Sequence, residues 1–119
     1  MIVDDEPALV ALAEETLADL GYEPLGFSSS LAALQAFRTE PSRFDLVLTD
    51  ETMPDLTGTE LAGEILRLRP ESAFILMSGY GGSQLSERAQ ALGILDVLRK
   101  PLLRREIAEP VARALHPRN

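Results

Sequence analysis

Five polar residues each follow a short apolar run of the sequence, and their types suit one kind of chemistry. They are Asp4, Asp5, Asp50, Ser78 and Lys100. Three carboxylates that lie close together repel one another and cannot all stay ionised without a cation. Because these residues supply only oxygen ligands, a hard cation such as Mg²⁺ suits the site better than zinc does. Aspartate is a known covalent nucleophile, and Mg²⁺, a lysine and a hydroxyl can neutralise a phosphoryl group during transfer. The set therefore predicts Mg²⁺-dependent phosphoryl transfer to an aspartate.

This chemistry requires the five residues to meet, and the apolar pattern of the chain predicts how they do so. The predicted strands are residues 1–3, 22–27, 46–49, 73–77 and 94–98. The predicted helices cover residues 7–20, the stretch between 30 and 41, the stretch from 57 through 68, and residues 83–92 and 103–115. Such alternation favours an α/β fold, a doubly wound five-stranded parallel sheet with helices on both faces. Ligands of these sheets bind at the carboxyl ends of the strands, where all five residues stand.

The periodicity also predicts which side chains the helices bury. The helix at residues 7–20 is expected to end at Gly21 and to bury Leu9, Leu12, Thr16, Leu17 and Leu20. The next helix is expected to bury Leu31, Leu34 and Phe37, and the third to bury Leu61, Ile65 and Leu68. The strand at 46–49 is apolar throughout, which indicates burial on both of its faces.

Caps, prolines and glycines predict where the elements begin, end or bend. Ser30 is expected to cap the second helix, and Thr57-Gly58-Thr59-Glu60 has the spacing of a capping box for the third. Pro24 suits an edge strand, and Pro110 is expected to kink or shorten the last helix. Gly58 and the glycines of residues 79–82 are interpreted as turn residues, because no GxGxxG or Walker lysine pattern is present.

Composition bounds the function classes. The 119 residues fit one domain, and their net charge of −8 argues against a nucleic-acid-binding face. The sequence has no cysteine, no signal peptide and no apolar run of about 20 residues, so we expect a cytoplasmic domain without membrane contact. The strand at residues 1–3 is shorter than usual, and we therefore expect residues 1–119 to be a single domain taken from a larger protein.

The ordered motifs at the strand ends resemble those of the receiver (response-regulator) family over nearly the whole chain. They are Val3-Asp4-Asp5-Glu6, Leu46-Val47-Leu48-Thr49-Asp50, Met53-Pro54-Asp55-Leu56-Thr57-Gly58, Ile75-Leu76-Met77-Ser78-Gly79 and Leu98-Arg99-Lys100-Pro101. In their residue choices these motifs most resemble receivers attached to hybrid sensor histidine kinases. The resemblance implies a flavodoxin-like (βα)₅ fold with strand order 2-1-3-4-5.

The resemblance also implies a role for each site residue. Asp50 would be the phosphoacceptor, Asp5 a direct Mg²⁺ ligand, and Asp4 a ligand largely through a metal-bound water. The backbone carbonyl of Thr52 would be a further ligand. Ser78 would donate a hydrogen bond to the phosphoryl group, Lys100 would pair with it, and Pro101 would follow a cis peptide bond that orients the lysine.

The function implied is that of a phosphoacceptor in a two-component phosphorelay. The domain would take a phosphoryl group from a histidine kinase and pass it to a phosphotransfer histidine. It would catalyse its own phosphorylation and dephosphorylation without being a stand-alone turnover enzyme. We expect the domain to be a monomer. Many receivers carry an aromatic switch residue three positions before the lysine. Here that residue is Val97, which favours a relay role over an output switch. The single histidine, His116, lies near the C-terminus and is given no role. Because no catalytic-domain sequence surrounds it, the chain is not expected to be a histidine kinase itself.

Other interpretations remain open at this point. Asp4 and Asp5 could be acids at a helix N-terminus, and Asp50, Ser78 and Lys100 could be turn residues. The domain could be a single-domain or output-linked response regulator, or a pseudo-receiver that docks proteins without being phosphorylated. A mononucleotide binder of the same fold is disfavoured, because the carboxylates after the first strand would repel a phosphate.

Overall fold

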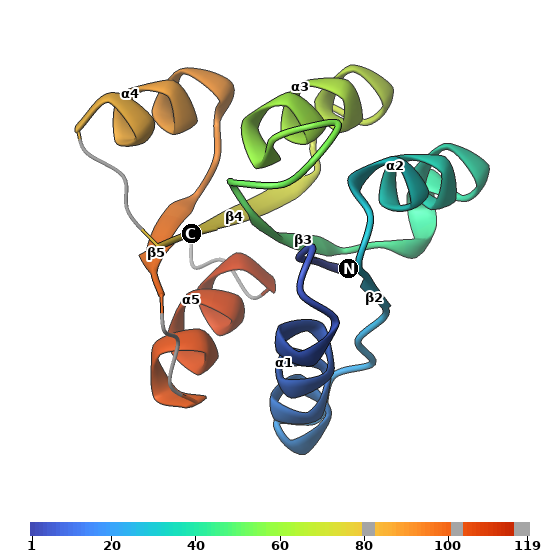
Figure 1. Ribbon diagram of the computed structural model, residues 1–119, viewed down its shortest axis with the longest axis vertical. Helices are drawn as coiled ribbons and strands as arrows, with labels where there is room; N and C mark the ends of the chain where they lie inside the picture. Colours follow the sequence, from blue (N-terminus) through green and yellow to red (C-terminus); the bar gives the residue numbers. More distant parts are fainter. Residues whose placement is uncertain (80–82, 101–103, 116–119) are drawn as a thin grey trace.

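The computed structural model describes residues 1–79, 83–100 and 104–115, and these form a five-stranded parallel sheet with helices on both faces (Figure 1). The strand order is β2-β1-β3-β4-β5, as the resemblance implies. The strands are β1 (Ile2–Val3), β2 (Gly26–Phe27), β3 (Leu46–Asp50), β4 (Ala73–Ser78) and β5 (Asp96–Arg99). The predicted doubly wound α/β fold of the flavodoxin type is therefore confirmed.

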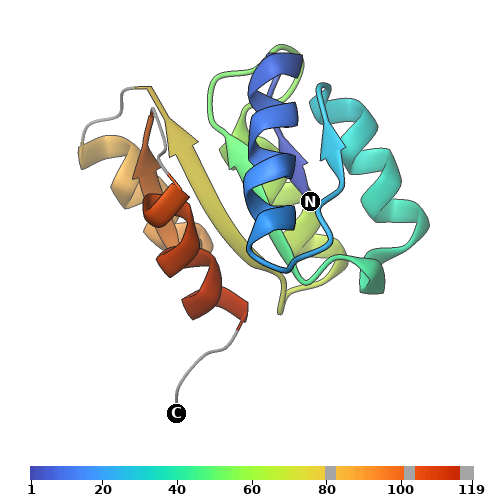
Figure 2. The same ribbon diagram turned by 90° about the horizontal axis from the view of Figure 1, so that it is seen from below.

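The helices form two layers. They are α1 (Pro7–Asp19), α2 (Ser30–Thr39), α3 (Gly58–Leu68), α4 (Ser83–Leu92) and α5 (Arg104–Leu115), with a short 3₁₀ turn, η1 (Pro41–Arg43), after α2. Helices α1 and α5 cover one face of the sheet, and α2, α3 and α4 cover the other (Figures 1 and 2). Within the described residues, none of these helices has the length and apolar character needed to cross a membrane.

The sheet is held by an apolar core on each of its faces. All five residues of β3 are buried, as expected for a strand covered by helices on both sides. Phe37 and Phe74 are fully buried on the side of α2, α3 and α4, and Ile75 lies on the side of α1 and α5. Burying a side chain of this size stabilises the fold by roughly 1.5–3 kcal/mol. This core fixes the strand ends that carry the polar residues.

The predicted buried faces of three helices are partly wrong. Helix α1 buries Val10, Ala13 and Leu17, whereas Leu12 is 56% exposed. In α2 the fully buried Ala33 takes the place expected for Leu31, and Leu68 of α3 is also exposed. Helix α1 is apolar around much of its circumference, so two different sets of apolar residues follow the helical period of 3.6. Packing against the sheet selected one of these two faces for burial.

Ser29, and not Ser30, caps helix α2. The Ser29 hydroxyl accepts a hydrogen bond from the Ala32 amide at 3.2 Å. Ser30 is the first residue of the helix and is buried. Its hydroxyl donates to the Pro54 carbonyl at 3.0 Å and accepts from the Leu56 amide at 3.2 Å. Either serine is a good cap, and the contact with residues 54–56, distant in sequence, decides between them.

Two strands and the last helix also differ from prediction. Strand β2 contains only Gly26 and Phe27 of the expected 22–27, because β1 offers only Ile2 and Val3 as partners. Strand β5 begins at Asp96, two residues later than expected. Pro110 lies inside α5 without shortening it, and its side chain is buried. The missing amide of a proline removes one helical hydrogen bond, and burial of its ring offsets part of that loss.

Candidate functional site

The topology brings the predicted site residues to one edge of the sheet. Asp4 and Asp5 follow β1, Asp50 is the last residue of β3, Ser78 is the last residue of β4, and Lys100 follows β5. Strands β1, β3, β4 and β5 are consecutive neighbours, and all are parallel. Their carboxyl ends therefore meet at the point where the strand order reverses, which is where ligands bind in such sheets.

The three aspartates form a compact acidic cluster. Carboxylate oxygens of Asp4, Asp5 and Asp50 all lie within 4.8 Å of one another. Asp4 is 2% exposed and Asp50 5%, whereas Asp5 is exposed. The Lys100 ammonium bridges the two buried members, donating to Asp4 Oδ2 at 2.7 Å and lying 3.3 Å from Asp50 Oδ2. Asp5 is thus the carboxylate of the cluster that solvent reaches most readily.

Backbone hydrogen bonds fix the positions of these side chains. The Glu6 amide donates to Asp4 Oδ1 at 3.0 Å, which orients the first carboxylate. The Lys100 amide donates to the Ser78 carbonyl at 2.9 Å, so the start of the segment after β5 is tied to the end of β4. The Ser78 side chain is buried in this same region. The site is therefore held by the sheet itself.

The electrostatics of the cluster follow from burial and crowding. Burial raises the pKa of Asp50, and the charges of Asp4 and Asp5 raise it further, while Lys100 acts in the opposite direction. Burial alone would lower the pKa of Lys100, but its hydrogen bond to Asp4 and the charge of Asp50 outweigh that effect and raise it. Lys100 therefore stays a cation beside two carboxylates.

The residues present fit a magnesium ion. Three carboxylates and one ammonium leave the cluster with a net charge of −2 when all are ionised, which one divalent cation would balance. Mg²⁺ prefers one or two carboxylates and keeps several waters, and the exposed Asp5 leaves a side of the cluster open to water. Thr52, expected to contribute its carbonyl, lies two residues beyond Asp50 in the bend after β3.

Gly58 allows helix α3 to approach the end of β3. It is the first residue of α3 and not a turn glycine, which corrects the prediction. A Cβ at this position would collide with the Asp50 carbonyl and would lie 2.7 Å from Leu76 Cδ2. The predicted capping box is confirmed, because Thr57 and Glu60 exchange side-chain-to-backbone hydrogen bonds of 2.9 and 3.2 Å. Close packing at Gly58 thus holds the loop that follows Asp50.

We expect Gly58→Ala to lower the free energy of unfolding by about 1–3 kcal/mol, because the added methyl group forces the backbone at Asp50 to move. Gly63→Ala in the same helix is the matched control. A Cβ there meets no atom within 4 Å, and alanine should stabilise the helix by roughly 0.5–1 kcal/mol. Urea denaturation of both variants checks the prediction, and equal changes of the same sign would contradict it.

Glu51 is a buried site neighbour that the sequence did not single out. Its carboxylate accepts hydrogen bonds from the Thr59 amide at 2.7 Å and the Thr59 hydroxyl at 3.0 Å. Arg88 of helix α4 lies 3.8 Å from the same carboxylate. Through these contacts Glu51, which directly follows Asp50, is linked to both α3 and α4. The capping box at residues 57–60 already supplies an acid, Glu60, at the N-terminus of α3. No local pattern in the sequence indicated that Glu51 would also contact this N-terminus.

The remaining sequence expectations have mixed outcomes. Val97 lies in β5 and packs against the core cluster on the side of α2, α3 and α4, as an ordinary strand residue does. Gly79 has no atom within 4 Å of a hypothetical Cβ, so this position is open. Pro101 and His116 lie outside the described residues.

Comparison with known families and proteins gives a consistent result. The family described as "Response regulator receiver domain" matches residues 1–112. The chain is 34% identical over 119 residues to response regulator protein PilR of Pseudomonas aeruginosa, covering all of this chain and 26% of PilR. It is 30% identical over 116 residues to sensor histidine kinase GacS of Pseudomonas protegens, covering 93% of this chain and 12% of GacS. The chain thus spans about a quarter or less of these curated relatives.

Solved structures agree with the sequence relatives. A response regulator receiver domain protein from Clostridium thermocellum superposes with a TM-score of 0.91 at 30% identity, covering 96% of this chain and 90% of that one. A receiver domain protein from Methanospirillum hungatei gives a TM-score of 0.84, also at 30% identity and with the same coverage. The similarity therefore extends over nearly the whole of this chain.

Proposed function

Because this chain belongs to the response regulator receiver domain family, the phosphoacceptor domains of two-component signalling, we propose that Asp50 accepts the phosphoryl group. The observation that carries this assignment is the contact set of Asp50. Its carboxylate is buried at the end of β3, within 4.8 Å of two further carboxylates and 3.3 Å from the Lys100 ammonium. Asp5 is exposed, and Asp4 accepts hydrogen bonds on both of its oxygens, from the Glu6 amide and from Lys100. Lys100 lies farther from Asp50, at 3.3 Å, and these differences favour Asp50 as the nucleophile.

In the proposed reaction a carboxylate oxygen of Asp50 forms a bond to the phosphorus of a phosphohistidine. The P–N bond breaks, the imidazole nitrogen leaves with the bonding electron pair, and an acyl phosphate is formed. Asp4, Asp5, Asp50 and the carbonyl of Thr52 would hold Mg²⁺. Bound there, Mg²⁺ would neutralise the phosphoryl oxygens. Lys100 would move from its bridge between Asp4 and Asp50 to pair with the phosphoryl group, and Ser78 would donate a hydrogen bond to it.

The test of this chemistry is the intact mass of the chain after incubation with phosphoramidate and MgCl₂. We expect the gain of a single phosphoryl group, and chelation of Mg²⁺ should prevent it. No gain from a folded chain in saturating Mg²⁺ would contradict the proposal and would favour a docking module that is not phosphorylated.

We further propose that the domain works as a relay in the cytoplasm, within a longer protein such as a hybrid histidine kinase. It would receive phosphate from a kinase histidine and donate it to a phosphotransfer histidine. Two observations support this proposal, namely the Val97 side chain in place of an aromatic switch and the similarity to the sensor kinase GacS. Transfer of the phosphoryl group from the phosphorylated chain to a histidine phosphotransfer protein within minutes would support the relay. Retention of the phosphoryl group on this chain would contradict it.

An apolar groove beside the acidic cluster fits the helical partner that such transfer needs. Leu9, Leu12 and Ala13 of α1 and Ile107 of α5 line a cavity of about 340 Å³ that reaches Asp4 and Lys100. Leu12 is 56% exposed, so this part of the groove is accessible. A partner helix packed there would present its phosphohistidine to Asp50.

We expect Leu12→Ala to slow phosphotransfer from a phosphorylated histidine phosphotransfer protein by about tenfold, since losing a buried interface leucine costs roughly 1–2 kcal/mol. Phosphorylation by phosphoramidate should keep its wild-type rate, because this donor is too small to use the groove. Leu95→Ala is the control, since Leu95 is equally exposed but precedes β5 at the opposite end of the sheet. A similar loss with both donors would contradict a role in partner binding.

A further inference from the structure

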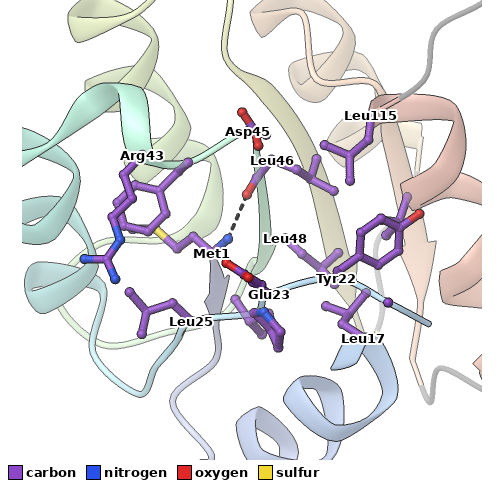
Figure 3. Close-up of a pocket in the computed structure, with 15 residues that line it drawn as sticks. Met1, Leu17, Tyr22, Glu23, Leu25, Arg43, Asp45, Leu46, Leu48 and Leu115 are labelled. Atoms are coloured by element: carbon purple, nitrogen blue, oxygen red, sulfur yellow. Dashed lines mark hydrogen bonds between the residues drawn. The ribbon is translucent and has the colours of Figure 1, made fainter. Parts of the chain in front are cut away.

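The two ends of strand β3 are packed differently. Near its amino end, Leu46 and Leu48 line a cavity of about 660 Å³, which Met1 also lines (Figure 3). At its carboxyl end, Asp50 and the residue that follows it, Glu51, are both buried. Because the cavity leaves the amino end of the strand incompletely packed, the position of the proposed phosphoacceptor depends on the contacts made at the carboxyl end.

Glu51 makes these contacts with both its backbone and its side chain. Its amide donates to the Met77 carbonyl of β4 at 2.9 Å, and its carbonyl accepts from the Gly58 amide of α3 at 2.9 Å. Its carboxylate accepts from the Thr59 amide at 2.7 Å and from the Thr59 hydroxyl at 3.0 Å. Three hydrogen bonds thus join this single residue to the first turn of α3.

These three hydrogen bonds close a loop at the site. Residues 52–57 leave Glu51 and return to it at the start of α3. The middle of the loop is held by the Ser30 hydroxyl, which bonds to the backbone of residues 54 and 56. Closing a loop reduces the number of conformations that its residues can adopt. Thr52, whose carbonyl is the proposed fourth ligand of Mg²⁺, is the first residue of this loop and is exposed.

The bonds to Thr59 are the strongest interactions of the Glu51 carboxylate. The only other charged group given near it, the Arg88 guanidinium, lies 3.8 Å away on a side chain that is 63% exposed, and such pairs contribute little. The start of α3 already has an acid in its capping box, Glu60, so the helix does not need a second one to begin. A buried carboxylate is costly unless it is hydrogen-bonded, and here the hydrogen bonds are directed at the loop closure.

We propose that Glu51 is a positioning residue for the metal site. By bonding to the first turn of α3, its carboxylate closes the loop of residues 52–57 and holds the Thr52 carbonyl in the orientation that binds Mg²⁺. Glu51 itself touches neither the ion nor the phosphoryl group. This inference rests on the function proposed above, in which Thr52 is one of the ligands. Residues that orient a ligand in this way commonly change metal affinity by about 10–100-fold when they are replaced.

The experiment measures the Mg²⁺ dissociation constant of the folded chain by titration with MgCl₂, following the carbonyl ¹³C resonance of Thr52. We expect Glu51→Ala to raise this constant about tenfold. Glu51→Gln should bind Mg²⁺ as the wild type does, because its oxygen can accept from the Thr59 amide and its NH₂ group can donate to the Thr59 hydroxyl. Equal weakening by both variants would overturn the proposal, since it would show that the charge of Glu51 acts on the ion and its hydrogen bonds do not.

Two control variants separate the loop closure from other effects. Arg88→Ala removes the ion pair and leaves the bonds to Thr59 in place. Ile65→Val leaves a small cavity in α3, where Ile65 is fully buried, and lowers stability without touching the loop. Both should bind Mg²⁺ with the wild-type dissociation constant. A rise in Ile65→Val equal to that in Glu51→Ala would overturn the proposal, because general loosening of α3 would then explain both.

The phosphorylation rate gives a second test. With phosphoramidate, Glu51→Ala should react more slowly than the wild type at low Mg²⁺ and reach the wild-type rate at saturating Mg²⁺. A rate that is reduced by the same factor at every Mg²⁺ concentration would overturn a role in metal binding. In the wild type itself, a Thr52 carbonyl that does not respond to MgCl₂ would contradict the proposed ligand set, and this inference would fall with it.

Discussion

Asp50→Asn is expected to abolish phosphorylation by phosphoramidate and Mg²⁺ and, at the same time, to stabilise the metal-free fold. Asparagine has no carboxylate oxygen to form the acyl phosphate, so the loss should be complete within detection. The Asp50 carboxyl has a raised pKa because burial and two neighbouring carboxylates disfavour its charge. Its ionisation therefore costs stability as the pH rises above the unfolded value of 3.8, and at pH 7 the amide removes that cost.

Intact mass and urea denaturation in a chelator measure the two effects separately. Asp55→Asn is the matched control, because Asp55 is exposed and has a φ of 69°, a conformation that asparagine tolerates. This control should be phosphorylated like the wild type. Residual phosphorylation of Asp50→Asn at the wild-type rate would show that another residue is the acceptor, and a fall in stability would show that the Asp50 carboxylate contributes favourable contacts in the metal-free site.

Lys100→Ala is expected to reduce both the phosphorylation rate and the stability. Lys100 is the cation that contacts Asp4 at 2.7 Å and Asp50 at 3.3 Å, and without it three carboxylates face one another. Breaking a fully buried pair costs about 3–5 kcal/mol, and since 20% of this side chain is exposed we expect about 2–3 kcal/mol in chelator. Loss of one donor to the phosphoryl group should slow the reaction roughly 10²–10³-fold.

Magnesium gives this variant a distinctive response. Because the ion would replace part of the missing positive charge, MgCl₂ should raise the urea midpoint of Lys100→Ala more than that of the wild type. Arg99→Ala is the control, since Arg99 is the preceding residue, exposed at the end of β5, and should show the wild-type response. An equal response of Lys100→Ala and wild type to Mg²⁺ would indicate that Lys100 and the ion do not share the same carboxylates.

The sequence by itself determined the fold class of this protein and which polar residues lie at the carboxyl edge of its sheet. Alternating strand and helix patterns predict a parallel sheet, and parallel strands place their carboxyl ends at one edge. Asp4, Asp5, Asp50, Ser78 and Lys100 could therefore be assigned to one cluster before any contact was known. The capping box at Thr57 and Glu60 was also predictable, because both of its hydrogen bonds are local.

Only the tertiary structure decided which of several local options is used. Ser29 and Ser30 are equally good caps, and the contact of Ser30 with residues 54–56 made Ser29 the cap. The apolar surface of α1 could face the sheet through Leu12 or through Val10, and packing selected Val10. Glu51 and Gly58 owe their roles to the approach of α3 to the end of β3, across residues that no local period connects. Local hydrogen bonds and periods can be inferred from neighbouring residues, whereas these choices depend on which distant surfaces meet.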